Sequence, residues 1–258
     1  MSGGEEKRTH QGIAIAQAIP LKGIRKKIAE HMIQSHLNSA RVTSLHEIDV
    51  TELVSFRNEL LKNPERTEGL KISYTHLLIK TISQALRKHP MLNSALGDNE
   101  VLILEDINIG VAMALPDGNL IVPVIHQADR KDLLEIVRRT KDLEERAQKG
   151  KLTVADMQKG TFTLSNVGML PEARWFTPII NQAQCALLGT GAIRQAPVVR
   201  DGQIVIRWVM TTSLSYDHRI LNNGIYIEYF IQTLVQLLQN PAAVEWHGQP
   251  RGMPDQTV

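Results

Sequence analysis

The sequence predicts a single mixed α/β domain, in which a mixed β-sheet is flanked by helices, and three observations support this fold class. Helical and strand patterns interleave along the 258 residues without the regular strand–helix alternation of a doubly wound fold. No linker divides the middle of the chain, and a chain of this length can bury a sizeable core in one domain. Hydrophobic residues make up 43% and charged residues 22%, which is ordinary for a globular protein.

The chain divides into three expected parts. Residues 1–19 are polar and then rich in Ala and Gln, which predicts a linker or an extended N-terminal arm. Residues 20–240 carry the helical and strand patterns and form the expected folded domain. Residues 241–258 form an expected C-terminal tail that is polar and contains Pro and Gly.

Periodicity and turn residues place the elements. The expected helices cover a stretch from residue 21 onward, 51–62, 75–88, 131–149 and 224–238. The expected strands cover 42–50, a pair within 101–113, 120–126, 161–165, 176–180, 185–190 and 203–214. We expect Thr51 to act as an N-cap, and the run PDGN at 116–119 to form a turn. In the helix over 131–149, the expected inward face is Leu133, Leu134, Val137, Leu143 and Ala147.

Composition excludes several classes of protein. A net charge of +2 is too weak to indicate a nucleic-acid partner. No apolar run approaches the ~20 residues of a membrane span, and no secretory signal begins the chain. Cys185 is the single cysteine, so no internal disulfide can form and a reducing, intracellular setting is expected. It opens the run CALLG, where we expect a buried core thiol.

Familiar catalytic and metal-binding motifs are absent. The sequence contains no GxSxG elbow, no HExxH, no CxxC and no P-loop. The run GTG at 189–191 lacks the third glycine of a dinucleotide fingerprint. His31 and His36 are five residues apart and fall on different faces of the expected helix, so we predict no metal site.

The most informative stretch is SLSYDHRILNNG, residues 213–224. A strand leads into it and a helix leaves it, so Asp217, His218 and Arg219 are expected at a strand end, where rigid scaffolds often present catalytic groups. A histidine titrates near neutral pH and can therefore take up and return a proton. A turn histidine beside a salt-bridged Asp217 is the alternative interpretation of the same residues.

The DHR motif, together with five other blocks, resembles the catalytic core of the 2-oxoacid dehydrogenase complex acyltransferases, which are related to chloramphenicol acetyltransferases. The blocks occur in the family's order over about residues 20–240. They are PLKGIRKKIAEHM (20–32), HPMLNSAL (89–96), INIGVAMALPDGNLIVPVI (107–125), GTFTLSNVGML (160–170) and FTPIINQAQCALLGTGAI (176–193). The resemblance implies the CoA-dependent, chloramphenicol acetyltransferase-like fold.

The resemblance also implies a mechanism. His218 would be the general base that removes the proton from the attacking thiol of coenzyme A or dihydrolipoamide. Ser165 would donate a hydrogen bond to the tetrahedral oxyanion, although a strand-end serine bonded to backbone is the plainer interpretation of that residue. An acyl group, with acetyl expected, would pass directly between the two thiols in a ternary complex.

Two positions depart from or complete the family pattern. Asn222 stands where relatives usually have Asp, and Arg25 matches the arginine that pairs with that residue. Here the pair would be a hydrogen bond and not a salt bridge, while a solvated helix arginine is the other interpretation of Arg25. Asn223 replaces the usual glycine, and Asn tolerates left-handed backbone better than most residues.

Family cores are trimers, so the resemblance implies a homotrimer with His218 from one chain and Ser165 from its neighbour. A larger cubic or dodecahedral core is an open question because the tail is polar. The implied partners are a lipoyl domain that carries lipoamide and is not present in this chain, a 2-oxoacid decarboxylase and dihydrolipoamide dehydrogenase. We expect a cytoplasmic location, or the mitochondrial matrix in a eukaryote.

Two other functions remain. One is a stand-alone CoA acyltransferase for a small acceptor, like the chloramphenicol enzymes. The other is a non-catalytic scaffold core of the same kind of complex. Retention of both His218 and Ser165 favours an enzyme, whereas Asn222 keeps the scaffold in consideration.

Overall fold

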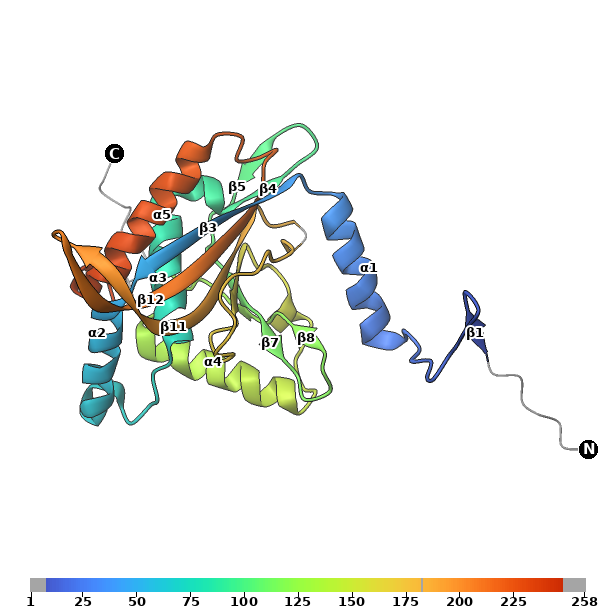
Figure 1. Ribbon diagram of the computed structural model, residues 1–258, viewed down its shortest axis with the longest axis horizontal. Coiled ribbons are helices and arrows are strands. Elements are labelled where there is room, and N and C mark those ends of the chain that lie inside the picture. Colours follow the sequence, from blue (N-terminus) through green and yellow to red (C-terminus); the bar gives the residue numbers. More distant parts are fainter. Residues whose placement is uncertain (1–7, 182, 248–258) are drawn as a thin grey trace, which may run out of the picture.

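A six-stranded mixed sheet forms the centre of the molecule, with strand order β3-β12-β11-β10-β6-β9 (Figure 1). β10 runs parallel to β6 and β11, and the other neighbouring strands are antiparallel. The predicted mixed α/β class is therefore confirmed. The strands are β3 (Arg41–Asp49), β6 (Ile109–Val111), β9 (Val124–Ile125), β10 (Phe162–Asn166), β11 (Ala186–Arg200) and β12 (Gln203–Asp217).

The computed structural model describes residues 8–181 and 183–247, without the side chain of Ile24. The expected arm (1–19) is thus described from residue 8 onward, and the expected tail (241–258) as far as residue 247; the rest of both lies outside the described residues. Among the described residues, no helix has the length and apolar character that a membrane span requires.

Helices cover one face of the sheet. α3 and α5 pack on it, and the rings of Phe162 on β10 and Phe230 on α5 lie 6.1 Å apart between centroids in the core. α1 stands away from this body and joins it through its C-terminal end (Figure 1). The α-helices are α1 (Gly23–Leu37), α2 (Thr51–Lys62), α3 (Tyr74–Lys88), α4 (Leu133–Gln148) and α5 (Gly224–Gln239), and the 3-10 helices are η1 (Pro64–Thr67), η2 (Pro90–Leu92), η3 (Ala155–Met157) and η4 (Pro241–Ala243).

Three small hairpins complete the described elements: β1 (Thr9–His10) with β2 (Ile13–Ala14), β4 (Ser94–Leu96) with β5 (Val101–Ile103), and β7 (Met113–Ala114) with β8 (Leu120–Ile121). The expected PDGN turn joins β7 to β8, and Gly118 takes a φ of +80° there. The pair expected within 101–113 is wrong, because β5 pairs with β4 while β6 belongs to the main sheet. Pro123 separates β8 from β9, so the expected strand over 120–126 is two short ones.

The starts of α2 and α3 differ from expectation, and the N-cap of α2 is Val50. Thr51 is not the N-cap of α2; Asp49 accepts hydrogen bonds from both the amide and the hydroxyl of Thr51, at 3.1 and 2.7 Å. α3 begins at Tyr74 after a capping box in which Ser73 and His76 bond each other's backbone.

The inward face of α4 differs from expectation at one position. Ile136 is buried, whereas the predicted Leu134 is only partly buried.

Residues 168–181 and 183–184 form no regular helix or strand and pack on part of the second face of the sheet, so the strand predicted at 176–180 does not form. Pro178 cannot donate a ladder hydrogen bond. The segment is held by side-chain packing instead. The ring of Phe176 lies directly over Gly189, so close that a Cβ on Gly189 would be 2.6 Å from the ring. Arg41 of β3 holds the segment by donating to the carbonyls of Thr177 and Pro178.

The distal ends of β11 and β12 extend beyond the other strands as a two-stranded ribbon, which makes β11 longer than the predicted 185–190. β12 exceeds its predicted range of 203–214 at the other end, where it continues to Asp217. The ribbon is anchored by Asp49, whose side chain is 7% exposed and accepts from Arg200 and Arg207, each at 2.9 Å. Burial alone would raise the pKa of Asp49, but the hydrogen bonds from Thr51, Arg207 and Arg200 outweigh burial and lower it to about 2.

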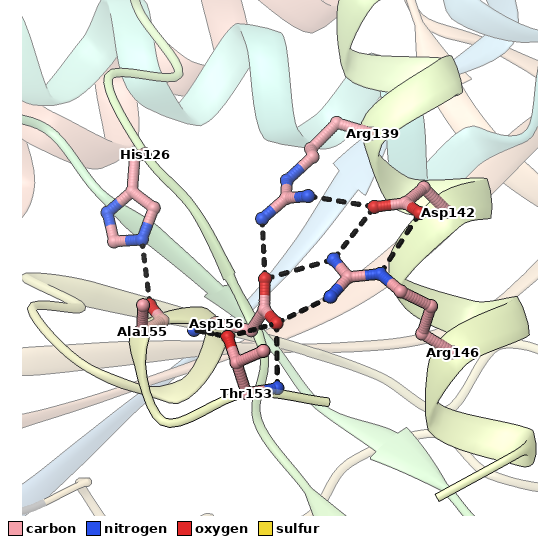
Figure 2. A network of polar contacts seen from close by, with 7 residues as sticks. All are labelled: His126, Arg139, Asp142, Arg146, Thr153, Ala155 and Asp156. Atoms are coloured by element: carbon pink, nitrogen blue, oxygen red, sulfur yellow. Dashed lines mark hydrogen bonds and ion pairs between the residues drawn. The ribbon is translucent and has the colours of Figure 1, made fainter. Parts of the chain in front are cut away.

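A second ion-pair network ties α4 to the loop that leads into β10 (Figure 2). Asp156, in η3, is buried and accepts from Arg146 at 2.6 and 2.9 Å and from Arg139 at 2.7 Å. Asp142, one turn before Arg146 on α4, bonds both arginines on the exposed side. The hydrogen bonds from Arg146 are the main reason that the pKa of Asp156 lies far below its usual range. The network fixes the approach to the strand that carries Ser165.

Asp49→Asn is predicted to lower the free energy of unfolding by about 2 kcal/mol at pH 7, the scale of hydrogen bonds to a charged group. Because the pKa of Asp49 is depressed, its contribution is present above the ordinary pKa near 3.8 and is lost as pH falls toward 2. Urea unfolding of both proteins between pH 7 and pH 2.5 should show the difference shrinking only below about pH 4. A constant difference across this range would contradict the role of the carboxylate charge.

Arg146→Met is predicted to destabilise the protein by about 3 kcal/mol, since it leaves the buried Asp156 carboxylate with part of its partners missing. Arg138→Met is the matched control on the same helix. Arg138 pairs with Glu68 at the surface, with both side chains about half exposed, so its loss should cost under about 1 kcal/mol. Equal effects of the two substitutions in thermal unfolding would refute the special role of the Asp156 network.

Candidate active site

The turn after β12 presents His218. The amide of Asp217 donates to the carbonyl of Cys185 and that of His218 donates to the carbonyl of Ala40, both at 2.9 Å. The side chain of His218 is exposed, and its ring lies 6.2 Å from that of Tyr216 with 28° between the planes. The backbone of the histidine is therefore fixed to two neighbouring segments while its imidazole faces outward.

Asp217 and Arg219 form the frame of this turn. Nε of Arg219 donates to Asp217 Oδ1 at 3.0 Å and Nη2 to Oδ2 at 2.6 Å, and Arg219 also donates to the carbonyl of Asn38 at the end of α1. Burial would raise the pKa of Asp217, but the hydrogen bonds from Arg219 and the amide of Ala40 outweigh it and the pKa is lowered. Both oxygens of this ionised carboxylate are used, which fits the expected supporting role and not proton transfer.

Ser165 lies near the C-terminal end of β10 and is half-buried. In the sheet register it pairs with Gly189 on β11, which pairs with Ser213 on β12. Gly189 has no side chain, and the ring of Phe176 fills the space above it. Ser165 therefore lies next to the site where Phe176 packs on Gly189.

The register also fixes the separation of Ser165 from His218 within one chain. His218 lies five residues beyond Ser213 on β12, which is about 17 Å along the strand, and two strands away from Ser165, about 10 Å across the sheet. The two Cα atoms are thus close to 20 Å apart. A reacting carbon must lie about 3 Å from both the nucleophile and the oxyanion donor, so these two side chains cannot serve one reaction centre within one chain.

Asn222 and Arg25 are not brought together within one chain. Asn222 is exposed in the loop between His218 and α5. Arg25 is exposed in the first turn of α1, 13 residues or about 20 Å of helix before Asn38 at the end held by Arg219. It lies instead toward the β7–β8 turn, where its charge adds to the hydrogen bonds from Asn119 in lowering the pKa of Asp117. The expected hydrogen bond between Arg25 and Asn222 is absent from the single chain.

Asn223 is the N-cap of α5, a role that the sequence did not indicate. Its φ is −122°, so no left-handed backbone is needed, and its Oδ1 caps α5 by accepting from the amide of Ile225 at 3.0 Å. Cys185 is fully buried, and burial raises the pKa of its thiol to about 12, in agreement with the predicted core thiol. Gly191 is a packing residue, because a Cβ there would lie 2.3 Å from the carbonyl oxygen of Arg174.

Two pockets adjoin the two halves of the candidate site. One, of about 320 Å³, lies beside the histidine turn and is lined by residues that include Asn38, Ile180, Asp217 and Arg219. The other, of about 300 Å³, lies beside the end of β10 and is lined by residues that include Tyr74, Asn166, Gly168 and Met210. Among the described residues, no group of three or more His, Cys, Asp or Glu side chains is arranged to hold a metal ion.

Sequence reasoning missed the residues around Ser165. Asn166 donates to the hydroxyl of Thr75 at 2.9 Å and accepts from the amide of Gly168 at 2.8 Å. The run FTLSNVG contains Ser165, Asn166 and Gly168, but the sequence gives no sign that Asn166 bonds Thr75. The fold shows this contact, which joins residues 91 positions apart.

The family model for the 2-oxoacid dehydrogenases acyltransferase (catalytic domain) matches residues 14–245. The dihydrolipoyllysine-residue acetyltransferase component of the pyruvate dehydrogenase complex from Bacillus subtilis is 37% identical over 226 residues, which are 87% of this chain and 50% of that protein. The chain spans about half the length of the curated relatives it matches. Other such relatives are succinyltransferase and branched-chain acyltransferase components.

Solved structures agree with this assignment. The dihydrolipoamide acetyltransferase of Azotobacter vinelandii superposes with a TM-score of 0.83 at 33% identity, covering 89% of this chain and 94% of that one. That structure belongs to an investigation of the role of a serine, a histidine and an asparagine in the catalytic mechanism of the A. vinelandii enzyme. Another similar structure is the cubic core of a pyruvate dehydrogenase multienzyme complex. A chloramphenicol acetyltransferase, at 14% identity and a TM-score of 0.52 over 81% of this chain and 94% of that one, shows the fold alone. The chain belongs to the 2-oxoacid dehydrogenases acyltransferase (catalytic domain) family.

Proposed function

We propose that this domain transfers an acyl group, with acetyl as the first candidate, between dihydrolipoamide and coenzyme A. The observation that carries the proposal is the exposed His218, held by its backbone at the end of β12, in a chain of this family. Acetyl is favoured because the B. subtilis relative is an acetyltransferase component, and succinyl and branched acyl groups are the alternatives.

In the forward direction, His218 takes the proton from the thiol of coenzyme A. The thiolate attacks the thioester carbon of acyl-dihydrolipoamide, and Ser165 donates a hydrogen bond to the oxyanion that forms. When the tetrahedral intermediate collapses, its C–S bond to dihydrolipoamide breaks and the leaving thiolate receives the proton from His218. The positions of both substrates in one ternary complex supply much of the rate.

The site is completed by a second copy of the chain in a homotrimer, because His218 and Ser165 are about 20 Å apart within one chain. The exposed apolar side chains of the N-terminal region support such an assembly; they are Ile13, Ile19, Leu21, Ile33 and Leu37, each more than half exposed. We extend the same argument to Asn222 and Arg25, which would pair across this interface.

The partners follow from the substrates. Lipoamide would arrive on a lipoyl domain. A 2-oxoacid decarboxylase would supply the acyl group to it, and dihydrolipoamide dehydrogenase would reoxidise the dihydrolipoamide that the transfer leaves. The asparagine named for the A. vinelandii enzyme lies four residues after the histidine, as Asn222 does after His218, so Asn222 is compatible with catalysis. This weakens the argument for a non-catalytic scaffold. Larger cubic assembly and a cytoplasmic location belong to the same proposal.

His218→Ala is predicted to lower kcat for transfer from acetyl-CoA to free dihydrolipoamide by roughly a hundredfold or more, the scale of a positioned general base. Ser165→Ala should lower it by roughly 100- to 1,000-fold, the scale of one oxyanion donor. His126→Ala is the matched control and should leave kcat unchanged. His126 is half-buried, and its ring bonds the carbonyl of Ala155 at 3.2 Å.

The assay also separates the alternative functions. An unmodified chain that forms a folded trimer but turns over no acetyl, succinyl or isobutyryl donor would support the scaffold. Transfer from acetyl-CoA to small alcohols or amines in preference to dihydrolipoamide would support the stand-alone acyltransferase.

Mixing the two inactive variants is predicted to restore activity if the site is shared. When Ser165→Ala and His218→Ala chains are unfolded, mixed in equal amounts and refolded, about one quarter of the sites combine an intact histidine with an intact serine. The refolded mixture should therefore show about one quarter of the unmodified activity. Activity that stays at the level of the single variants, with mixed trimers demonstrated by mass spectrometry, would show that the site lies within one chain.

A further inference from the structure

The end of β10 that carries Ser165 is held on one side only. β10 pairs with β6 through Phe162–Leu164, and the last bond on that side is donated by the amide of Ala112 to the carbonyl of Leu164 at 2.9 Å. Ser165 and Asn166 pair only with β11. β11 is itself irregular next to them, because its register with β12 shifts between Thr190 and Ile193. The sheet alone therefore gives Ser165 weak support.

The side chain of Asn166 supplies the missing restraint. Its Nδ2 donates to Oγ1 of Thr75 at 2.9 Å, and its Oδ1 accepts from the amide of Gly168 at 2.8 Å. One bond ties the strand end to α3, and the other closes the turn that follows. The approach is tight, since a Cβ on Gly168 would lie 2.9 Å from Asn166 Oδ1 and also 2.9 Å from the carbonyl oxygen of Gly191.

The partner on α3 is rigid. Thr75 lies in the first turn of the helix, which the capping box of Ser73 and His76 closes. Burial lowers the pKa of His76 to about 4, so its ring is neutral and Nδ1 accepts from the amide of Ser73 at 3.1 Å. Beyond this turn, α3 is buried from His76 to Leu86. Asn166 thus links Ser165 to the most deeply buried helix of the domain.

We propose that Asn166 is a positioning residue that sets the backbone of Ser165, through its bonds to Thr75 and Gly168, in the geometry needed to donate to the oxyanion. This inference rests on the proposed function of Ser165. Successive side chains of a strand point to opposite faces, so Asn166 acts from the helix side while the hydroxyl of Ser165 points to the other side.

A double-mutant cycle tests the proposal. Asn166→Ala should lower kcat by roughly 10- to 100-fold with little change in KM, the scale of a misplaced catalytic group. In a Ser165→Ala background the same substitution should cost less than about twofold, because the hydroxyl that it positions is already gone. Asn108→Ala is the matched control; Asn108 is buried, donates to the carbonyl of Lys159 and accepts from the amide of Gln127, each at 2.8 Å. Any effect of this control should be the same in both backgrounds.

Thr75 provides a milder pair of variants in case Asn166→Ala fails to fold. Thr75→Val keeps the shape but removes the oxygen that Asn166 donates to, and should reproduce most of the loss in kcat. Thr75→Ser keeps the hydroxyl and should retain most of the activity.

The outcomes separate this inference from the proposed function. A Ser165→Ala variant with full kcat would sink the role of Ser165 and this inference with it. If Ser165→Ala lowers kcat as predicted, but Asn166→Ala lowers kcat by the same factor with and without Ser165, the positioning role alone would be overturned. Equal kcat values for Thr75→Val and Thr75→Ser would do the same.

Discussion

The register of three adjacent strands is the constraint on which the site depends. Ser165 on β10, Gly189 on β11 and Ser213 on β12 stand in one row, and His218 follows five residues further along β12. Hydrogen-bonded strands cannot slide to bring the serine and the histidine together, because a shift of one residue would turn every side chain to the other face. The same row that orders the core therefore keeps Ser165 and His218 apart, and in the proposed mechanism a second chain would complete the site.

Each half of the site has its own support, and both halves lead back to buried structure. The histidine turn is framed by the Asp217–Arg219 pair and by backbone bonds to Cys185 and Ala40. The serine end of β10 pairs with β11 and is linked by the side chain of Asn166 to the rigid first turn of α3. Upstream of β10, Asp156 and two arginines of α4 fix the approach to the strand. Such support allows small groups to be held at the accuracy that catalysis requires.

Local sequence signals were sufficient for the fold class, most helix positions, the DHR turn and the family. These signals failed where contacts between residues far apart in the sequence determine the local structure. Thr51 looked like a cap, but the partner carboxylate of Asp49 is held by arginines of a ribbon about 150 residues later. The strand expected at 176–180 is absent, since Pro178 cannot donate a ladder hydrogen bond and Phe176 packs over Gly189. The role of Asn166 was hidden for the same reason, since its partner Thr75 is 91 residues away. Periodicity reports on neighbours along the chain, whereas these contacts arise from tertiary packing.

The most direct test of the shared site is a crystal structure of the assembled protein with coenzyme A bound, in which the distance from Ser165 Oγ to His218 Nε2 is measured within and between chains. The two atoms should be far apart within each chain, with Cα atoms about 20 Å apart, and should face one bound thiol across the interface between two chains. A structure in which the serine and histidine nearest to the bound thiol come from the same chain would contradict the account.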